Sequence, residues 1–270
     1  MLRPRGSMKN VLITGAYGGM GRATVSLLSE MGCRVFALDI KVGEPQKNVI
    51  PVQVDLTSET KVAQALTTVK EYTDHLDAIV HFAGIYMLDS LVEMESESFR
   101  RIFDINLQGA YLINKTFLPL LDRGSRILMT TSELAPLDPL PFTGIYAVTK
   151  AALDKYAYSL KMELQLLGIE VSVLRAGAIE TDMLGASTAA LDRFCQKTQL
   201  YHCNAARFKS IVERVEARCV PPSRIAKKAV NILNKRRPAF AYSINRNPLL
   251  LLLNLLPKRL QLWAIRKVLR

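Results

Sequence analysis

The chain has 270 residues and a formal net charge of +12, with 49% hydrophobic and 22% charged residues. This length and composition are typical of one globular domain with a real core, and they exclude a disordered or collagen-like chain. Four cysteines without CxxC spacing exclude a disulfide scaffold and favour a reducing, cytoplasmic setting. Cys195, His202 and Cys203 lack a second ligand cluster, so no metal site is expected.

The basic residues are concentrated at one end of the chain. Residues 217–270 contain thirteen Lys or Arg and no Asp or Glu, so the whole basic excess lies there. Residues 1–7 resemble a cloning remnant and are excluded from the fold prediction. We therefore divide the rest into a body, residues 8–245, and a basic, apolar tail, residues 246–270.

Short apolar runs alternate with longer segments of helical period. The predicted strands are Val11–Thr14, Arg34–Leu38, Val49–Val54, Ala78–Phe82, Arg126–Thr131 and Glu170–Leu174. Most of these runs are continuously apolar, as strands buried on both faces are. The predicted helices include Arg22–Met31, Glu59–Tyr72, Phe99–Leu121 and Tyr146–Leu167. The alternation predicts a single doubly wound α/β domain with a parallel sheet.

A glycine-rich segment joins the first predicted strand to the first helix. It reads Thr14-Gly15-Ala16-Tyr17-Gly18-Gly19-Met20-Gly21. Glycines permit a tight turn and let the backbone approach a pyrophosphate, and the helix N-terminus attracts that anion. The segment predicts a dinucleotide site; the alternative is a glycine turn kept only for packing.

Two carboxylates follow the next strands. Asp39 ends the second strand, where an acidic residue accepts hydrogen bonds from the ribose 2′-hydroxyl and repels a 2′-phosphate. This position favours NAD over NADP, although Lys41 would screen the repulsion. Asp55 follows the third strand and either accepts a hydrogen bond from the adenine amino group or caps the helix near Ser58.

Tyr146 and Lys150 are four residues apart on a predicted helix and therefore share one face. A protonated lysine beside a phenol lowers the phenol pKa. A tyrosine tuned in this way can exchange a proton with an alcohol or carbonyl oxygen. Ser132 ends the fifth predicted strand, at the sheet edge where parallel sheets bind ligands.

With these motifs the chain resembles the short-chain dehydrogenase/reductase (SDR) family from about Lys9 to about Tyr242. The matching residues are Thr14, Gly15, Gly19 and Gly21 of a TGxxxGxG loop, Asp55, the Ala83-Gly84 turn, Asn106, Ser132, Tyr146 and Lys150. The resemblance implies a Rossmann-type domain with a seven-stranded parallel sheet flanked by helices. It also implies a nicotinamide cofactor, direct hydride transfer and a homodimer or homotetramer.

The resemblance also implies a role for individual residues. Tyr146 would be the general acid/base, Ser132 would orient the substrate oxygen, and Lys150 would hold the nicotinamide ribose and tune Tyr146. Asn106 would anchor a water in the proton relay. The implied cofactor contacts are Thr14, Gly15, Tyr17, Gly19, Met20, Gly21, Asp39, Asp55, Leu56, Ala83, Gly84, Tyr146, Lys150 and Thr181.

Three features depart from the family pattern. The usual Asn-Asn-Ala-Gly reads His81-Phe82-Ala83-Gly84, and the usual Pro-Gly reads Ala176-Gly177. Ser132 stands 14 residues before Tyr146, where about 12 or 13 are expected, which leaves open whether Ser132 or Glu133 faces the pocket. These departures leave an alternative: a catalytically weak or inactive dinucleotide-binding scaffold acting at a membrane or with a partner protein.

Apolar segments at 134–145 and 183–220 predict a pocket for a hydrophobic secondary alcohol or its ketone, steroid-, retinoid- or acyl-like. The apolar run Pro248–Pro257 is too short to span a bilayer, and the basic Lys258–Arg270 follows it. The tail predicts either peripheral membrane contact or packing on the body, on a partner subunit or over the pocket. Nucleic-acid binding is disfavoured because no aromatic stacking platform accompanies the cations.

Overall fold

Seven parallel strands form the centre of the computed structural model, which describes residues 8–216 and 219–270. The strands are β1 (Asn10–Thr14), β2 (Arg34–Asp39), β3 (Val49–Gln53), β4 (Ala78–His81), β5 (Arg126–Ser132), β6 (Glu170–Ala176) and β7 (Ala241–Ile244). Their order is β3-β2-β1-β4-β5-β6-β7. The predicted doubly wound, seven-stranded sheet is confirmed, whereas the suggested remnant at residues 1–7 lies outside the described residues.

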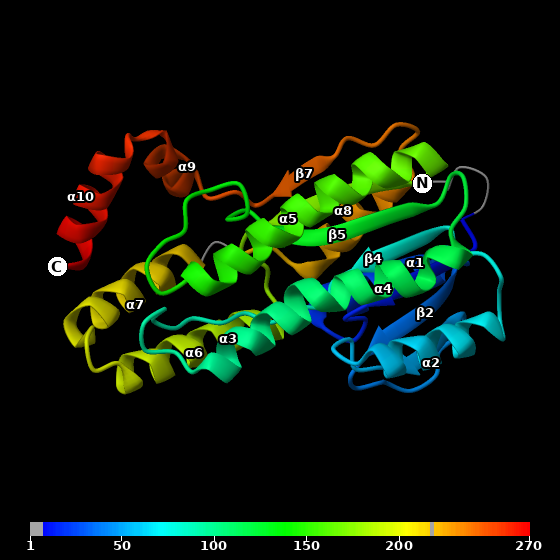
Figure 1. Ribbon diagram of the computed structural model, residues 1–270, viewed down its shortest axis with the longest axis horizontal. Helices are drawn as coiled ribbons and strands as arrows, with labels where there is room; N and C mark the ends of the chain where they lie inside the picture. Colours follow the sequence, from blue (N-terminus) through cyan, green and yellow to red (C-terminus); the bar gives the residue numbers. More distant parts are fainter. Residues whose placement is uncertain (1–7, 217–218) are drawn as a thin grey trace.

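Helices cover both faces of this sheet (Figure 1). On one face lie α2 (Glu59–Lys70), α4 (Gly109–Phe117) and α5 (Gly144–Leu164), and on the other lie α1 (Gly19–Glu30) and α8 (Pro222–Leu233). Successive residues of a strand pack against opposite faces of the sheet. In β1, Leu12 packs on the side of α2, α4 and α5, whereas Val11 and Ile13 pack on the side of α1 and α8. Two separate apolar cores therefore hold the strand ends in fixed positions.

The predicted helix Phe99–Leu121 is confirmed as a continuous helical segment, but its hydrogen-bonding pattern changes within it. The structure has α3 (Ser96–Phe103), a π-helical turn η1 (Asp104–Gln108), then α4 and a 3-10 turn η2 (Leu118–Leu120). Single π-helical turns inside α-helices are frequent at functional sites, and this one carries Asn106. The periodicity of apolar residues could not separate a π-turn from the α-helices on either side.

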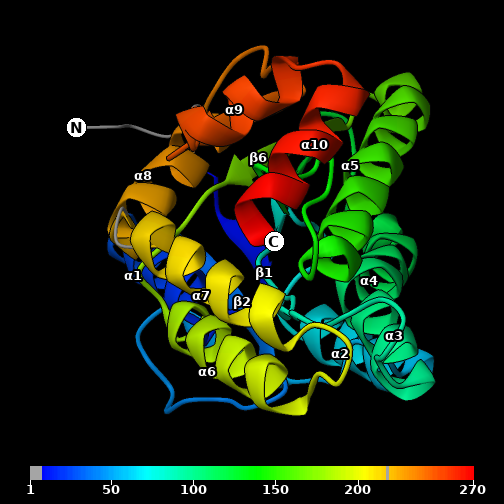
Figure 2. The ribbon, with the colours of Figure 1, turned by 90° about the vertical axis from the view of Figure 1, so that its left-hand side faces the viewer.

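Four further helices lie beyond the carboxyl ends of the strands. They are α6 (Asp182–Lys197), α7 (His202–Glu216), α9 (Pro248–Leu255) and α10 (Lys258–Leu269). Figure 2 shows α6 and α7 on one side of this edge and α9 and α10 on the other, with the C-terminal end of α10 between them. A third apolar cluster, including Phe142, Phe194, Phe208 and Leu269, joins α6, α7 and α10 to the loop before α5. Across residues 8–216 and 219–270, no helix has the length and apolar character needed to cross a bilayer.

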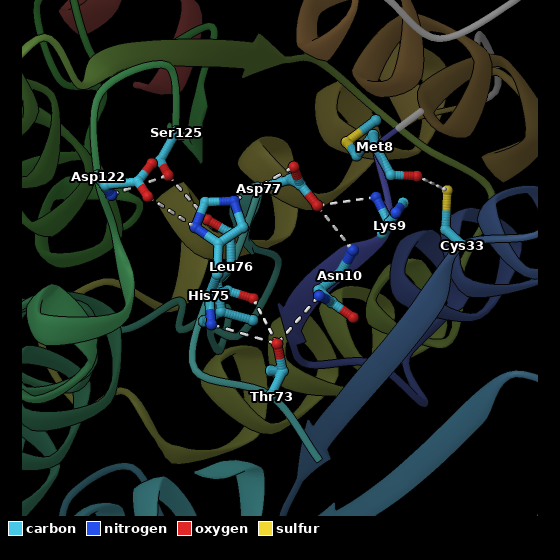
Figure 3. A network of polar contacts seen from close by, with 10 residues as sticks. All are labelled: Met8, Lys9, Asn10, Cys33, Thr73, His75, Leu76, Asp77, Asp122 and Ser125. Atoms are coloured by element: carbon cyan, nitrogen blue, oxygen red, sulfur yellow. Dashed lines mark hydrogen bonds and ion pairs between the residues drawn. The ribbon is translucent and has the colours of Figure 1, made fainter. Parts of the chain in front are cut away.

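A polar network connects several segments at the amino ends of the strands, opposite the edge just described (Figure 3). Asp77 precedes β4, and its Oδ2 accepts hydrogen bonds from the backbone N–H groups of Lys9 at 2.7 Å and Asn10 at 2.8 Å. His75 lies between Asp77 Oδ1 at 3.4 Å and Asp122 Oδ2 at 3.2 Å. The Asp77 carboxylate thus joins the start of β1 to the start of β4.

We expect Asp77→Ala to lower the free energy of unfolding by about 1–2 kcal/mol, because two backbone donors lose a charged acceptor. Urea denaturation at neutral pH measures the change. Asp74→Ala, which removes an exposed carboxylate from the same turn, is the matched control. Equal stability of the two variants would show that the Asp77 network contributes nothing.

Candidate active site

The glycine loop between β1 and α1 has no room for side chains. Gly15 has a φ of +65°, and a Cβ there would lie 2.5 Å from the Ala83 backbone nitrogen. A Cβ on Gly21 would lie 2.0 Å from the Gly15 carbonyl oxygen. Gly18 is the N-cap residue of α1, so no side chain caps the first turn of that helix. A pyrophosphate therefore fits at the first turn of α1, whose backbone N–H groups no side chain caps.

The loop also contacts the segment that precedes α6. A Cβ on Gly19 would lie 2.6 Å from Thr181 Cγ2, so the two residues are in direct contact. Thr181 and Met20 both line the main cavity of the protein. Gly19 and Met20 therefore lie close to Thr181, which is far from them in sequence, as expected if all three contact the cofactor.

Asp39 lies at the end of β2 beside the glycine loop. Its Oδ2 accepts a hydrogen bond from the Tyr17 N–H at 2.9 Å, and its Oδ1 accepts one from the Ile40 N–H at 2.8 Å. These contacts orient the carboxylate next to the loop. This position fits a group that recognises the ribose hydroxyls of a dinucleotide.

Asp55 does not cap α2, so that alternative is wrong. The N-cap residue is Ser58, whose Oγ accepts a hydrogen bond from the Lys61 N–H at 3.3 Å. Asp55 Oδ1 instead accepts from the Thr57 hydroxyl at 2.7 Å and the Thr57 N–H at 3.0 Å, and these bonds lower the Asp55 pKa. The next residue, Leu56, packs against the start of α4, with its Cβ 3.0 Å from where a Cβ on Gly109 would lie.

Ser132 and Tyr146 meet at the floor of the main cavity. The Ser132 hydroxyl hydrogen-bonds to the Tyr146 hydroxyl, and it accepts a bond from the Leu134 N–H at 3.2 Å. The Tyr86 ring packs against Tyr146 with centroids 4.8 Å apart. Burial raises the Tyr146 pKa, Tyr86 adds to this rise, and the hydrogen bond from Ser132 opposes it. The predicted lowering is wrong for this structure because desolvation outweighs the other effects.

Lys150 lies one helical turn below Tyr146. Its Nζ is 5.8 Å from the centre of the Tyr146 ring and donates a hydrogen bond to the Thr130 carbonyl oxygen at 3.2 Å. Burial lowers the Lys150 pKa to about 8. A Cβ on Gly84 would lie 3.3 Å from this Nζ and 3.1 Å from Asn106 Oδ1, so the Ala83-Gly84 turn brings the three residues together.

The Asn106 side chain joins three elements. Its Oδ1 accepts a hydrogen bond from the Ile85 N–H at 2.8 Å, and its Nδ2 donates to the Ile85 carbonyl at 3.0 Å and to Thr149 Oγ1 at 3.1 Å. Asn106 therefore positions the wall after β4 relative to α5. Its implied role in anchoring a water stays a prediction.

Both Ser132 and Glu133 line the cavity, which answers the question left open by the spacing. The additional residue is accommodated in the loop before α5, so Ser132 keeps its contact with Tyr146. Glu133 Oε2 accepts a hydrogen bond from the Asn247 N–H at 2.6 Å, which attaches the start of α9 to this loop. Burial raises the Glu133 pKa, while the Asn247 N–H and Arg246 lower it by less.

His81 and Phe82, where the sequence departs from the family pattern, are both buried. His81 is buried, and its Nε2 lies 2.9 Å from Asn114 Oδ1. Asn114 Nδ2 in turn donates to the Tyr156 hydroxyl at 3.2 Å. This chain of contacts connects β4 to α4 and α5. Phe82 turns to the other side, where it is buried and lines the cavity.

The main cavity has a volume of about 520 Å³ and largely apolar walls. The loop before α5 is confirmed as a pocket wall. Of the predicted segment 183–220, the described lining residues come from α7 and are Phe208, Ile211 and Val212. The sequence did not indicate Tyr86, which also lines the cavity. The tail supplies a further wall: Leu249, Leu250, Leu253, Ala264, Ile265, Val268 and Leu269 line the cavity. Of the alternatives left open for the tail, the structure shows packing over the pocket.

Comparisons with known proteins agree with this geometry. A family model described as short chain dehydrogenase matches residues 9–192. The 2,3-dihydro-2,3-dihydroxybenzoate dehydrogenase of Escherichia coli (strain K12) is 30% identical over 178 residues, which cover 66% of this chain and 72% of that protein. The 3-ketodihydrosphingosine reductase of Bacteroides thetaiotaomicron is 24% identical over 262 residues, 95% of this chain and 96% of that protein.

Solved structures show the same fold. A short-chain dehydrogenase/reductase from Burkholderia phymatum in complex with NAD has a TM-score of 0.73 and 20% identity, covering 89% of this chain and 90% of that one. The chain belongs to the short-chain dehydrogenase/reductase family. It is an NAD(P)-dependent oxidoreductase.

Proposed function

We propose that the protein interconverts a hydrophobic secondary alcohol and its ketone, with NAD preferred over NADP. The observation that carries this proposal is the apolar cavity whose floor is the hydrogen-bonded pair Ser132 and Tyr146. Apolar walls with a few convergent polar groups select a hydrophobic ligand and orient it through one polar atom. The substrate oxygen is that atom.

The nicotinamide cofactor, when bound, supplies or removes a hydride. Tyr146 is the general acid/base: its hydroxyl donates a proton to the carbonyl oxygen in reduction, and its phenolate form accepts the alcohol proton in oxidation. Burial keeps Tyr146 protonated, which suits the acid role. The Ser132 hydroxyl would donate a second hydrogen bond to the substrate oxygen. Lys150 would hold the nicotinamide ribose.

The rest of the cofactor would lie along the carboxyl ends of β1, β2 and β4. The glycine loop would hold the pyrophosphate, Asp39 the adenine ribose, and Asp55 with Leu56 the adenine. Thr181 would contact the nicotinamide carboxamide, since it lies against Gly19 and lines the cavity. The similarity to a 3-ketodihydrosphingosine reductase extends over nearly all of both chains and supports a lipid ketone as substrate.

We also propose that the protein acts as a homodimer or homotetramer. Large apolar side chains are exposed on the helices at one side of the sheet. They are Phe99 on α3, Tyr111 on α4, and Val148, Tyr158 and Met162 on α5. Burial of this surface between copies would remove apolar area from water.

A fluorescence titration with NADH and with NADPH tests the cofactor proposal. We expect tighter binding of NADH, and we expect Asp39→Asn to reduce the ratio of the two affinities about tenfold, since it removes one charge from the 2′-position. Glu44→Gln, which removes an exposed charge from the following loop, is the matched control. Preference of the unaltered protein for NADPH would overturn the role of Asp39, and binding of neither would overturn the dinucleotide site.

A further inference from the structure

The tail helices have two apolar faces. The inner face lines the cavity and the outer face is exposed to solvent. The outer face consists of Leu252, Leu255, Leu256, Leu260, Leu262 and Trp263, with exposed fractions between 40% and 80%. None of these six residues lines the cavity. Six large exposed apolar side chains on two consecutive short helices indicate an interaction site, because scattered single residues would need no partner.

The charge around the outer face has one sign. The exposed basic residues of the tail are Arg246, Lys258, Arg259, Arg266, Lys267 and Arg270, and residues 217–270 contain no acidic residue. Lys267 lies over the Trp263 ring, 5.1 Å from its centre. Tryptophan and basic residues flanking exposed leucines suit the boundary between lipid headgroups and acyl chains. An anionic lipid surface complements this charge.

The exposure of the outer face does not come from a detached tail. Lys258 forms an ion pair with Asp138, and the Asp138 N–H donates to Asn254 Oδ1 at 2.7 Å. At the far end, Asn204 Nδ2 of α7 donates to the Leu269 carbonyl oxygen at 2.7 Å. Both tail helices are therefore fixed over the cavity while their outer leucines stay exposed.

We propose that the outer face of α9 and α10 docks on an anionic phospholipid bilayer. Both helices are short, so they lie in the interface and do not span the bilayer. Because the inner face of the same two helices is a wall of the cavity, docking puts the cavity against the bilayer. The hydrophobic substrate then passes from the lipid phase into the cavity; this second step rests on the proposed function, whereas docking does not.

Vesicle flotation of the full chain tests docking. We expect partitioning onto vesicles of phosphatidylcholine with phosphatidylserine, and weak partitioning onto phosphatidylcholine alone. Arg259→Gln with Arg266→Gln should reduce partitioning onto the anionic vesicles roughly 20-fold, since each basic residue near such a surface contributes about fivefold. Leu255→Gln with Leu262→Gln should reduce it about as much, because two exposed leucines no longer enter the interface.

Two control variants test whether vesicle binding depends on the outer face itself or only on the number of basic or exposed apolar residues in the protein. Arg236→Gln with Arg237→Gln removes the same charge from the turn before β7, at the opposite end of the molecule (Figure 1). Leu166→Gln alters a leucine that is 80% exposed, as Leu255 is. Both controls should bind vesicles like the unaltered protein.

The contrary outcomes are distinct. Failure of the unaltered protein to bind anionic vesicles overturns the proposal, as does an equal loss in the Arg236 and Arg237 control. A smaller oligomer of the Leu255 and Leu262 variant in light scattering also overturns it, because the face would then contact a second copy. NADH titration is run in parallel: docking without NADH binding contradicts the proposed function alone, and NADH binding without docking contradicts only this inference.

Discussion

Tyr146→Phe is expected to lower kcat about a thousandfold, the contribution typical of a positioned general acid, and to leave the affinity for NADH unchanged. The substitution removes only the hydroxyl that hydrogen-bonds to Ser132 and keeps the ring that packs against Tyr86. The cavity therefore keeps its shape and loses its proton donor. Steady-state reduction of a hydrophobic ketone, followed at the absorbance of NADH, measures the effect.

Tyr156→Phe is the matched control for this variant. It makes the same change on the same helix, where the Tyr156 hydroxyl accepts a hydrogen bond from Asn114 and does not line the cavity. We expect normal turnover. If Tyr146→Phe also kept normal turnover, another group would have to supply the proton. Glu133 would be the first to examine, because burial raises its pKa and it lines the same cavity.

The parts of the site that could be predicted from sequence are those held by local chemistry. The glycine loop is one example. The motif has glycine at positions 15 and 21, and the structure leaves no space for a Cβ at either position. The helix that carries Tyr146 and Lys150 is another, since their spacing alone puts them on one face. Six strands were predicted close to their observed bounds for the same reason: buried parallel strands are continuous apolar runs.

The parts that could not be predicted depend on tertiary packing. The direction of the Tyr146 pKa shift is set by how deeply the ring is buried, which no spacing reveals. Strand β7 was not predicted from the apolar runs. Its residues Ala241–Ile244 are all only partly buried, because the strand lies at the edge of the sheet. The position of the tail could not be predicted because some of its leucines line the cavity and others are exposed on the outer face. Hydrophobicity alone does not distinguish the two groups.

His81 shows how a departure from the family pattern changes a physical property. It occupies a strand position at the centre of the sheet, packed between β1 and β5. Its contact with Asn114 connects β4 to α4. An imidazole at this buried position differs from an amide in one respect: it can be protonated.

We expect acid to destabilise the protein through His81. Burial lowers the His81 pKa from 6.5 to about 4, against a smaller rise from its contact with Asn114. Above pH 6.5 the side chain is neutral in both the folded and unfolded chains, so its pKa shift costs no stability. Between pH 6.5 and about 4 the unfolded chain binds a proton that the folded chain does not, so stability falls as pH falls. Below that window no further loss occurs.

The loss should approach about 3 kcal/mol across this window, which makes it the largest single pH effect that we expect on folding. Urea denaturation of the cofactor-free protein at pH 7.5 and pH 4.5 measures it. His81→Asn should remove most of the difference, because an amide keeps a donor for Asn114 and does not titrate. His202→Asn, at an exposed histidine of α7, should leave the difference intact. Equal acid sensitivity of the His81→Asn variant and the unaltered protein would show that carboxylates, and not this buried imidazole, control unfolding in acid.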